Sequence, residues 1–346
     1  MTPQRLDEIL SKATRLKIAI VGEVFLDKYL DIDRGLSEVS LETGREAHQV
    51  VNIRTYPGSG GSVGQKLAAL GVSWVPTLSV IGEDGEGYDL KKALRRDGMD
   101  PSWLVETPAR RTGTYTKPMM HEPGKEPYEL DRLDIRNHKP LEGELEDRVI
   151  ATLAEHIDSL DAVVVVDMVP QRNWGVVTDR VRKWICDFAG RHAGKVWFAD
   201  SRQRAGEFRN VIVKPNQKEL AHALGREEKA LDGLDALAAA AEELRRRTGR
   251  PVVVTRGAQG LLAVDGKGHK TIPGFQVTGP IDICGAGDSV TAGAVTALAA
   301  GATLEEAALL GNLVASITIQ QLGVTGTATP EQLRERLQEY NKQHAL

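Results

Sequence analysis

Short apolar runs that alternate with helical segments constrain the fold of this 346-residue chain most strongly. Runs such as Ala162–Asp167 are rich in valine, which is typical of strands buried on both faces of a sheet. Repeated strand–helix units form a mainly parallel sheet covered by helices on both faces. The expected strands are Lys17–Gly22, Ser73–Ile81, Ala162–Asp167, Lys195–Asp200, Val211–Lys214, Pro251–Thr255 and Gly260–Asp265. The expected helices are residues 1–15, Gly61–Leu70, Gly87–Asp97, Glu144–Ser159, Trp174–Arg191, Gln217–Leu224, Asp232–Thr248, Gly287–Gln320 and Pro330–Gln343.

Four other segments mix polar and apolar residues and resemble half-exposed strands. They are Phe25–Arg34, Ala47–Tyr56, Thr112–His121 and Tyr128–Ile135. We expect them to form a small, mostly antiparallel β lid, inserted into the α/β body as about residues 25–57 and 112–135. Because the chain shows no repeat or linker, residues 1–346 are expected to form a single domain.

A stretch of very small residues between two acids, Asp282–Asp288, precedes a helical segment. Gly285 and Gly287 let backbone amides crowd inward, and the start of the helix adds partial positive charge, which favours an anion. A carboxylate at this edge repels a resting phosphate, but it can accept the proton of a hydroxyl that attacks the phosphate. The motif therefore predicts phosphoryl transfer to an alcohol with Asp288 as base. The alternative is a helix cap without chemistry.

Other motifs allow a structural and a functional interpretation. The run Gly58-Ser59-Gly60-Gly61-Ser62 is either a tight turn or a loop that lets a ligand approach the backbone. Asn216 and Glu219 fit a capping box, or else contact magnesium and nucleotide phosphates. The turn Thr255–Gly260 either joins two strands or leaves room for a nucleotide. Asn312 is either a core amide or an adenine-side contact.

Several polar residues lie at or shortly after the carboxyl ends of expected parallel strands. Ligands of open parallel sheets bind beyond these strand ends. The polar residues are Asp27, Asp167, Asp200, Asn216 and Thr255. The glycine patterns of dinucleotide-binding and P-loop proteins are absent from the sequence, which disfavours a nicotinamide dehydrogenase and excludes a P-loop.

Composition excludes several classes of partner. Lys and Arg number 44 against 48 Asp and Glu, a net charge of −4, so nothing in the overall charge favours nucleic acid or an anionic membrane. No apolar stretch approaches the ~20 residues that span a bilayer. Cys186 and Cys284 form no disulfide framework, which indicates a reducing compartment. A cytoplasmic protein is expected.

Taken in order, the motifs resemble those of the ribokinase-like (PfkB) carbohydrate kinases, from about Lys17 to Pro330. The resemblance implies a three-layer α/β/α fold with a β lid, and a reaction that uses ATP and Mg²⁺. It makes Asp288 the base, with Gly285, Ala286 and Gly287 as the anion hole. The residues that it places at the sugar are Asp27, Gly58, Ser59, Gly60, Gly61, Ser62 and Arg132. The residues that it places at the nucleotide are Asn216, Glu219, Thr255, Gly257, Gly260 and Asn312. Glu219 would hold Mg²⁺ through water, and Asp282 would bind a monovalent cation such as K⁺.

Within this family the chain is most similar to kinases that phosphorylate D-glycero-β-D-manno-heptose 7-phosphate at O1. The similarity lies in Gly22–Tyr29, Glu129–Asp134 and Leu322–Thr325. The chain departs from the usual pattern at Glu23, where those kinases have Asp, at Ser62, where the family has Asn, and at Ile283, where it has Thr.

Because these departures concentrate on the sugar side, a kinase for ribose, fructose or a nucleoside stays an alternative, as does a non-catalytic sugar- or nucleotide-binding regulator. Cations for a phosphorylated sugar would come from the lid, with Lys28, Arg34, Lys117 and Arg132 as candidates. We expect the lid to close over the substrate and to form a homodimer interface.

Overall fold

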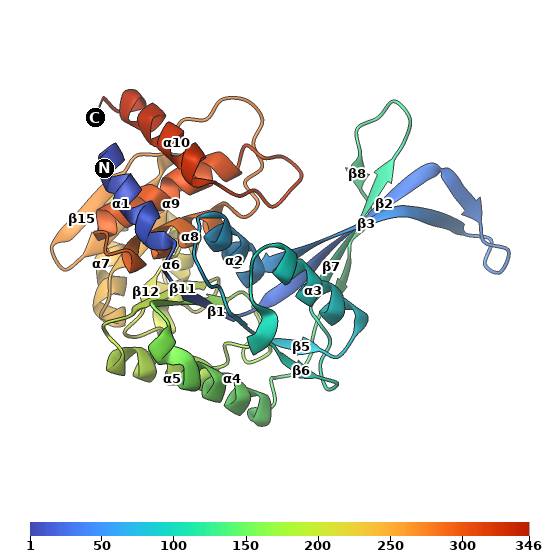
Figure 1. Cartoon of the computed structure of the whole chain (residues 1–346), viewed down its shortest axis with the longest axis horizontal. Helices are drawn as coiled ribbons and strands as arrows, with labels where there is room; N and C mark the ends of the chain where they lie inside the picture. Colours follow the sequence, from blue (N-terminus) through green and yellow to red (C-terminus); the bar gives the residue numbers. More distant parts are fainter. Residues whose placement is uncertain (346) are drawn as a thin grey trace.

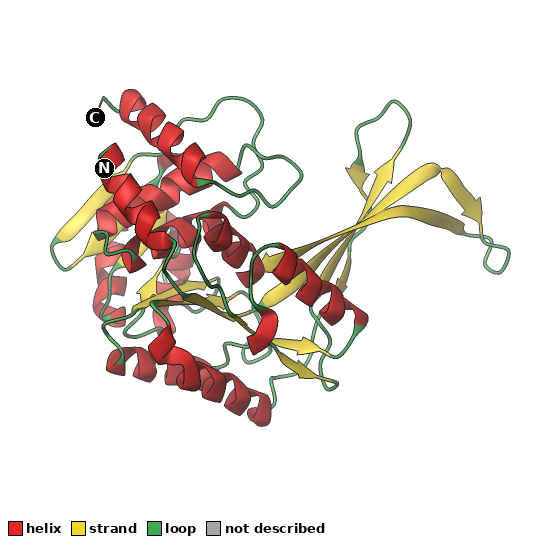
Figure 2. Ribbon diagram, viewed as in Figure 1, coloured by secondary structure: helices red, strands yellow, loops and turns green. Residues whose placement is uncertain are grey.

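A computed structural model describes residues 1–345, in which an eight-stranded sheet lies between two layers of helices (Figures 1 and 2). Most neighbouring strands are parallel, and the antiparallel pairs are β13 with β14 and β14 with β15 at one edge. From that edge the order is β15 (Gly268–Ile272), β14 (Leu261–Asp265), β13 (Val252–Thr255), β12 (Ile212–Val213), β11 (Val196–Ser201), β10 (Ala162–Asp167), β1 (Ile18–Gly22) and β4 (Thr77–Leu78). The mainly parallel sheet expected from the sequence is confirmed.

Successive side chains of each strand point to opposite faces of the sheet, so two cores form. Ile18 and Ile20 of β1 pack into one core, whereas Ala19 and Val21 pack into the other. One core is covered by α1 (Pro3–Ala13), α2 (Gly60–Ala69), α3 (Gly85–Arg96), α8 (Ala286–Ala299), α9 (Leu304–Thr318) and α10 (Pro330–Gln343). The other core is covered by α4 (Gly143–His156), α5 (Asp179–Arg191), α6 (Gln217–Leu224) and α7 (Leu234–Thr248). The three-layer arrangement follows from these two faces.

A second sheet projects from the body as a lid (Figure 1). Its strands are β2 (Val24–Val39), β3 (Glu46–Ser59), β7 (Thr114–His121), β8 (Tyr128–Glu129) and β9 (Leu133–Ile135). The expected antiparallel pairing holds except for β2 and β7, which are parallel. Parallel neighbours need a long crossover, and here α2 and α3 lie between them in the chain. The two segments expected in the lid both lie in this sheet.

The sequence analysis was wrong to expect one continuous strand over Ser73–Ile81. Only β4 joins the main sheet, while β5 (Val80–Gly82) leaves it and pairs with β6 (Val105–Thr107) in a separate two-stranded sheet. Two apolar segments in succession do not reveal that they have different partners. Strand β15, which the sequence analysis did not anticipate, is almost entirely exposed, so it lacks the apolar signal.

Two expected helices also need correction. The helix expected from Trp174 begins only at Asp179, because the Thr178 hydroxyl caps it by accepting from the Val181 amide. The helical region expected over Gly287–Gln320 holds two helices: α8 agrees with the helix expected over Ser289–Ala300, the chain turns at Gly301, which has φ +83°, and α9 begins with a capping box at Thr303.

Short 3₁₀ turns complete the chain at Pro101–Trp103, Ile157–Ser159, Ala205–Glu207, Glu228–Leu231 and Gly257–Gln259. Among residues 1–345, no helix has the length and apolar character needed to cross a membrane.

Candidate active site

The candidate site is organised around the start of α8. Gly285 is the N-cap residue and has φ +74°, a left-handed conformation that favours glycine. Helix starts leave their first amides without intrahelical partners. Here the Ala286 amide donates to the Ile283 carbonyl at 3.1 Å, and the amides of Gly287 and Asp288 come next. The geometry suits an anion at this helix start.

Asp288 lies in the first turn of α8 and is partly buried. Burial raises the pKa of this carboxyl above its ordinary value, while the Lys66 ammonium and a hydrogen bond from Ser62 oppose that rise. A carboxylate with a raised pKa is a stronger proton acceptor while it stays ionised. The environment of Asp288 is therefore compatible with a general base.

Lys66 is a buried residue at this site that the sequence analysis missed. It lies on α2, its side chain is 1% exposed, and its Nζ donates to the Ser62 Oγ at 2.8 Å. A Cβ on Gly285 would lie 3.5 Å from Lys66 Nζ and 3.6 Å from Asp288 Oδ2, so both groups face the same turn. The available signal was the spacing: Ser62 and Lys66 are four residues apart, on one face of a helix.

A second buried lysine lies on the other side of this helix start. Lys214 Nζ pairs with Asp200 Oδ2 at 2.9 Å, and the Thr291 hydroxyl donates to the same oxygen at 3.0 Å. A Cβ on Gly287 would lie 3.5 Å from Lys214 Nζ. Asp200 thus lies at the site, as expected, and its ion pair with Lys214 holds it in place. The sequence analysis assigned no role to Lys214.

A cavity of about 650 Å³ opens beside the helix start. Small-molecule sites commonly enclose about 300–1,000 Å³, so the cavity has the size of a ligand site. Its lining includes all six residues expected at the nucleotide, together with three from the start of α8: Asn216, Glu219, Thr255, Gly257, Gly260, Asn312, Ala286, Gly287 and Asp288. The structure therefore brings the expected nucleotide residues and the expected base to one cavity.

Several cavity residues also have structural tasks. Asn216 and Glu219 form the capping box of α6, with reciprocal hydrogen bonds of 2.8 Å. The Asn312 side-chain amide donates to the Pro273 carbonyl at 2.7 Å. A Cβ on Gly260 would lie 2.1 Å from the Ile272 carbonyl oxygen, so backbone packing alone requires glycine there. The structural interpretations of these residues, as cap, core amide and turn, therefore hold, and the same residues also line the cavity.

The acceptor side is built around Asp27 at the base of the lid. A Cβ on Gly58 would lie 2.9 Å from Asp27 Oδ2, so glycine leaves room for this carboxylate. Burial raises the pKa of Asp27, whereas Lys117 and Arg132 lower it. Lys117 Nζ lies 3.9 Å from Asp27 Oδ1 and donates to the Tyr29 hydroxyl at 3.0 Å.

The other lid cations are engaged elsewhere. Lys28 pairs with Glu86 at 3.5 Å, and Arg34 pairs with Glu46 far along the lid. Arg132 pairs with Asp134 at 2.8 Å. Of the four candidate cations, Lys117 is therefore the one that directly faces Asp27.

The expected loop of residues 58–61 is absent, because β3 ends at Ser59 and α2 begins at Gly60, and glycine serves packing in this first turn of the helix. A Cβ on Gly60 would lie 2.9 Å from the Glu23 carbonyl oxygen, and one on Gly61 would lie 2.4 Å from Pro57 Cβ. Ser59 has φ +56°, rare for a residue with a side chain, and its buried hydroxyl has no hydrogen-bond partner in residues 1–345.

The proposed cation ligand, Asp282, makes a local turn. Its Oδ1 accepts from the Cys284 amide at 2.9 Å, and its own amide donates to the Ile319 carbonyl at 2.8 Å. This arrangement orders the chain just before Gly285.

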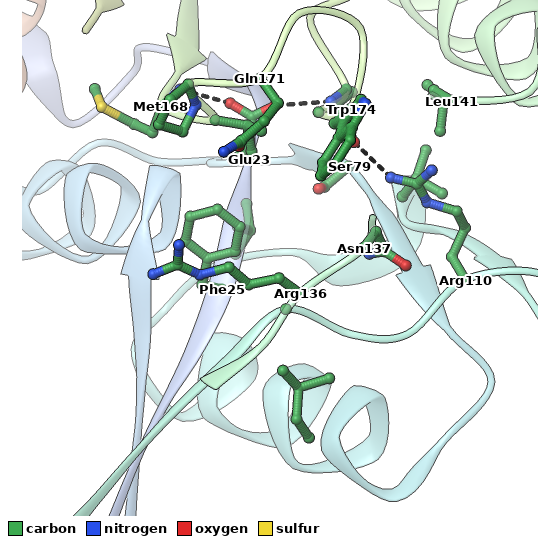
Figure 3. A pocket seen from close by; sticks show the side chains of 18 of the residues that line it. Glu23, Phe25, Ser79, Arg110, Arg136, Asn137, Leu141, Met168, Gln171 and Trp174 are labelled. Atoms are coloured by element: carbon green, nitrogen blue, oxygen red, sulfur yellow. Dashed lines mark hydrogen bonds between the residues drawn. The ribbon is translucent and has the colours of Figure 1, made fainter. Parts of the chain in front are cut away.

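A smaller cavity of about 160 Å³ lies at the base of the lid (Figure 3). Glu23 is buried in its wall and accepts 2.7 Å hydrogen bonds from the amides of Met168 and Val176. Burial, and then repulsion from Asp167, raise the pKa of Glu23 to about 7. Met168 lines both cavities, so the two adjoin.

Asp167, expected at the ligand edge of the sheet, is instead enclosed in a buried ion pair. Arg204 approaches one of its oxygens at 2.5 Å and the other at 3.1 Å. The pair leaves Asp167 without a direct role at the larger cavity, and its charge acts on Glu23.

Comparison with known proteins agrees with this architecture. Residues 17–332 match the family described as pfkB family carbohydrate kinase. The bifunctional protein HldE of Trichlorobacter lovleyi is 31% identical over 337 residues, which cover 96% of this chain and 65% of that protein. The bifunctional protein HldE of Gluconobacter oxydans is 28% identical, with 95% and 66% covered. The chain thus spans about two thirds of the length of these relatives.

Solved structures share the fold. Phosphofructokinase-2 from Escherichia coli in complex with fructose-6-phosphate superposes with a TM-score of 0.70 at 21% identity, covering 95% of this chain and 99% of that one. Ribokinase from Thermotoga maritima gives 0.64 at 21% identity, covering 93% and 99%. The fold is therefore ribokinase-like, and the chain belongs to the pfkB family of carbohydrate kinases.

Proposed function

We propose that the protein transfers the γ-phosphoryl group of ATP to a hydroxyl of a sugar or sugar phosphate, and that its acceptor is D-glycero-β-D-manno-heptose 7-phosphate, phosphorylated at O1. The observation that carries the reaction is the place of Asp288. It lies at the start of α8, on the wall of the large cavity, and its charge also acts on Asp27 at the base of the lid. The choice of acceptor is supported by the motif similarity to heptose kinases and by relatives named HldE.

In this proposal ATP occupies the large cavity with its phosphates at the start of α8. Asp288 takes the proton of the attacking hydroxyl, and the amides around Gly287 stabilise charge on the transferring phosphoryl group. Nucleophile and phosphate are then held together, which removes most of the entropic barrier.

A magnesium ion fits the cavity as a partner of the nucleotide. Residues 1–345 hold no cluster of three acidic, His or Cys side chains that would form a protein-only metal site. Mg²⁺ is commonly bound by phosphates and water with one or two carboxylates. In the capping box, Oε2 of Glu219 accepts a hydrogen bond from the Asn216 amide. Burial raises the pKa of the Glu219 carboxyl, and a nearby cation would oppose that rise and favour the ionised form. When bound, the ion would neutralise phosphate charge.

On the acceptor side, Asp27 would orient sugar hydroxyls, with Gly58 leaving the space, and Lys117 would face the phosphate of the sugar. Closure of the lid would exclude water from the γ-phosphate. Asp282 is proposed to contact a monovalent cation, K⁺ being the candidate. We place the reaction in the cytoplasm, which suits the free thiols of Cys186 and Cys284.

The test is ADP release from Mg·ATP with heptose 7-phosphate, ribose, fructose, fructose phosphates and nucleosides as acceptors. Asp288→Asn keeps the shape of the side chain and removes the base, so it serves as the matched variant. We expect turnover with the heptose phosphate and a loss of about 10²–10⁴-fold in the variant. Turnover with a different sugar alone would overturn the acceptor. Full activity of Asp288→Asn would overturn the base, and nucleotide binding without turnover on any acceptor would favour a regulator.

A further inference from the structure

The side chain of Lys66 is a buried cation without a carboxylate of its own. In residues 1–345 its close polar partners are the two oxygens of Ser62, the hydroxyl at 2.8 Å and the carbonyl at 3.4 Å. Lys214, equally buried, is paired with Asp200 at 2.9 Å. Burying an ammonium group without a partner charge carries a large desolvation cost. A residue kept at such a cost beside a reactive carboxylate is a candidate for function.

The ammonium group of Lys66 points to the start of α8. Its Nζ and Asp288 Oδ2 lie within 3.5 and 3.6 Å of one point, the position of a Cβ on Gly285. Lys214 Nζ lies at the same distance from the corresponding point on Gly287. Two ammonium groups therefore flank the amides on which an anion would bind.

The two lysines reach this anion position from different sides. Lys214 lines the large cavity, on the nucleotide side, whereas Lys66 is not part of that lining. Lys66 belongs to α2, which follows directly on the end of β3, where Gly58 adjoins Asp27. It therefore approaches the anion position from the acceptor side.

We propose that Lys66 contacts the transferring phosphoryl group from the acceptor side and completes the anion hole during transfer. The inference rests on the proposed kinase reaction. In the step, a bond forms between the acceptor oxygen and the γ-phosphorus, the bond from that phosphorus to the β–γ bridging oxygen breaks, and ADP leaves with the electron pair. The proton of the acceptor hydroxyl goes to Asp288. Lys66 stays protonated and exchanges no proton.

This role would act mainly on the rate of transfer. Because Lys66 reaches the anion position from the acceptor side, its contact with the phosphoryl group should strengthen as that group moves toward the acceptor. An interaction that strengthens in the transition state raises kcat, whereas one that is equal in both states changes KM. Burial lowers the pKa of Lys66 and the Asp288 carboxylate opposes this, so an arriving phosphoryl charge further favours the ammonium form.

The experiment compares wild type, Lys66→Met, Lys66→Arg and the control Lys91→Met; Lys91 lies on α3, pairs with Glu106 of β6 and takes no part in the site. Four quantities are measured for each: kcat, KM for ATP, the ligand-free Tm, and the affinity for Mg·ADP with and without fluoroaluminate. For Lys66→Met we expect kcat to fall about 10²–10³-fold. KM for ATP and the affinity for Mg·ADP should change by about 2-fold or less, while the gain in affinity from fluoroaluminate is lost.

A purely structural role gives a different result. The desolvation cost of the Lys66 ammonium and its attraction to Asp288 oppose each other, so the Tm of Lys66→Met should stay near that of wild type, and Lys66→Arg should recover part of kcat. A lowered Tm with a proportional loss of activity, an unchanged kcat, or an Arg variant no better than the Met variant would each overturn the proposal.

These outcomes are separable from the proposed function. If wild type transfers phosphate and Asp288→Asn does not, while Lys66→Met keeps full activity, the reaction stands and the role of Lys66 fails. If wild type transfers phosphate to no acceptor, the proposed function fails, and the fluoroaluminate comparison alone decides whether Lys66 binds the phosphoryl position.

Discussion

Replacing Glu23 by Gln should change how the stability of the protein depends on pH. Glu23 is 3% exposed, and its pKa is raised from 4.5 to about 7, first by burial and then by repulsion from Asp167. Between those two values the folded protein binds a proton that the unfolded chain does not. The free energy of unfolding therefore falls as pH rises through this interval and levels off above about 7. The difference of about 2.5 between the pKa values corresponds to about 3 kcal/mol.

Gln keeps the shape of the side chain and has no proton to lose. It can accept from only one of the two amides, Met168 or Val176, which now donate to the two carboxylate oxygens. Leaving one buried amide unpaired costs about 1–3 kcal/mol at every pH. The variant should be less stable than wild type near pH 5 and equally or more stable near pH 8, with their difference changing by about 3 kcal/mol over that range.

The assay is urea unfolding from pH 5 to 8.5, followed by tryptophan fluorescence. Trp174 lines the cavity that contains Glu23, so the signal reports on this region (Figure 3). Glu126→Gln, at an exposed position of the lid, is the control and should follow wild type at every pH. Parallel stability curves for wild type and Glu23→Gln would refute the reasoning, because they would show that the two amides keep the carboxylate ionised.

Three further predictions concern strain, a buried ion pair and assembly. Ser59→Gly should raise the free energy of unfolding by about 1–2 kcal/mol, measured by urea unfolding, because it relieves a left-handed residue and removes an unpartnered hydroxyl; a loss of stability would contradict this. Arg204→Met should lower the free energy of unfolding by about 3–5 kcal/mol, because it leaves Asp167 unpaired, and adding Asp167→Asn should recover part of this loss. Additive effects of the two substitutions in a double-mutant cycle would contradict the coupling. Val51 and Ile53 are exposed on the lid, so if the lid forms the dimer, Val51→Asp with Ile53→Asp should give monomers in light scattering; a monomeric wild type would exclude that dimer.

The layered fold was predictable because one physical pattern determines it. The apolar run of β1 sends Ile20 to one core and Val21 to the other, as a strand covered on both faces requires. What the pattern lacks is the partner of each strand. Val80–Gly82 is as apolar as its neighbours, and its pairing with Val105–Thr107 depends on a contact distant in sequence.

The local parts of the site were also predictable. Asn216 and Glu219 lie three residues apart at the start of α6, and a helix cap and a cavity wall are both found there. Asp167 shows the limit of this reasoning. Its place at the end of β10 was correct, but only the structure reveals that it forms a buried ion pair with Arg204.

Lys66 was not predictable from its own neighbourhood, because a lysine on a helix usually extends into water. Its position becomes intelligible through Ser62, one helical turn earlier. The Ser62 hydroxyl accepts from Lys66 and also lowers the pKa of Asp288, so it joins the cation to the base. Ser62 and Lys66 are therefore best understood as one pair, in which a small hydroxyl connects a buried charge to the base.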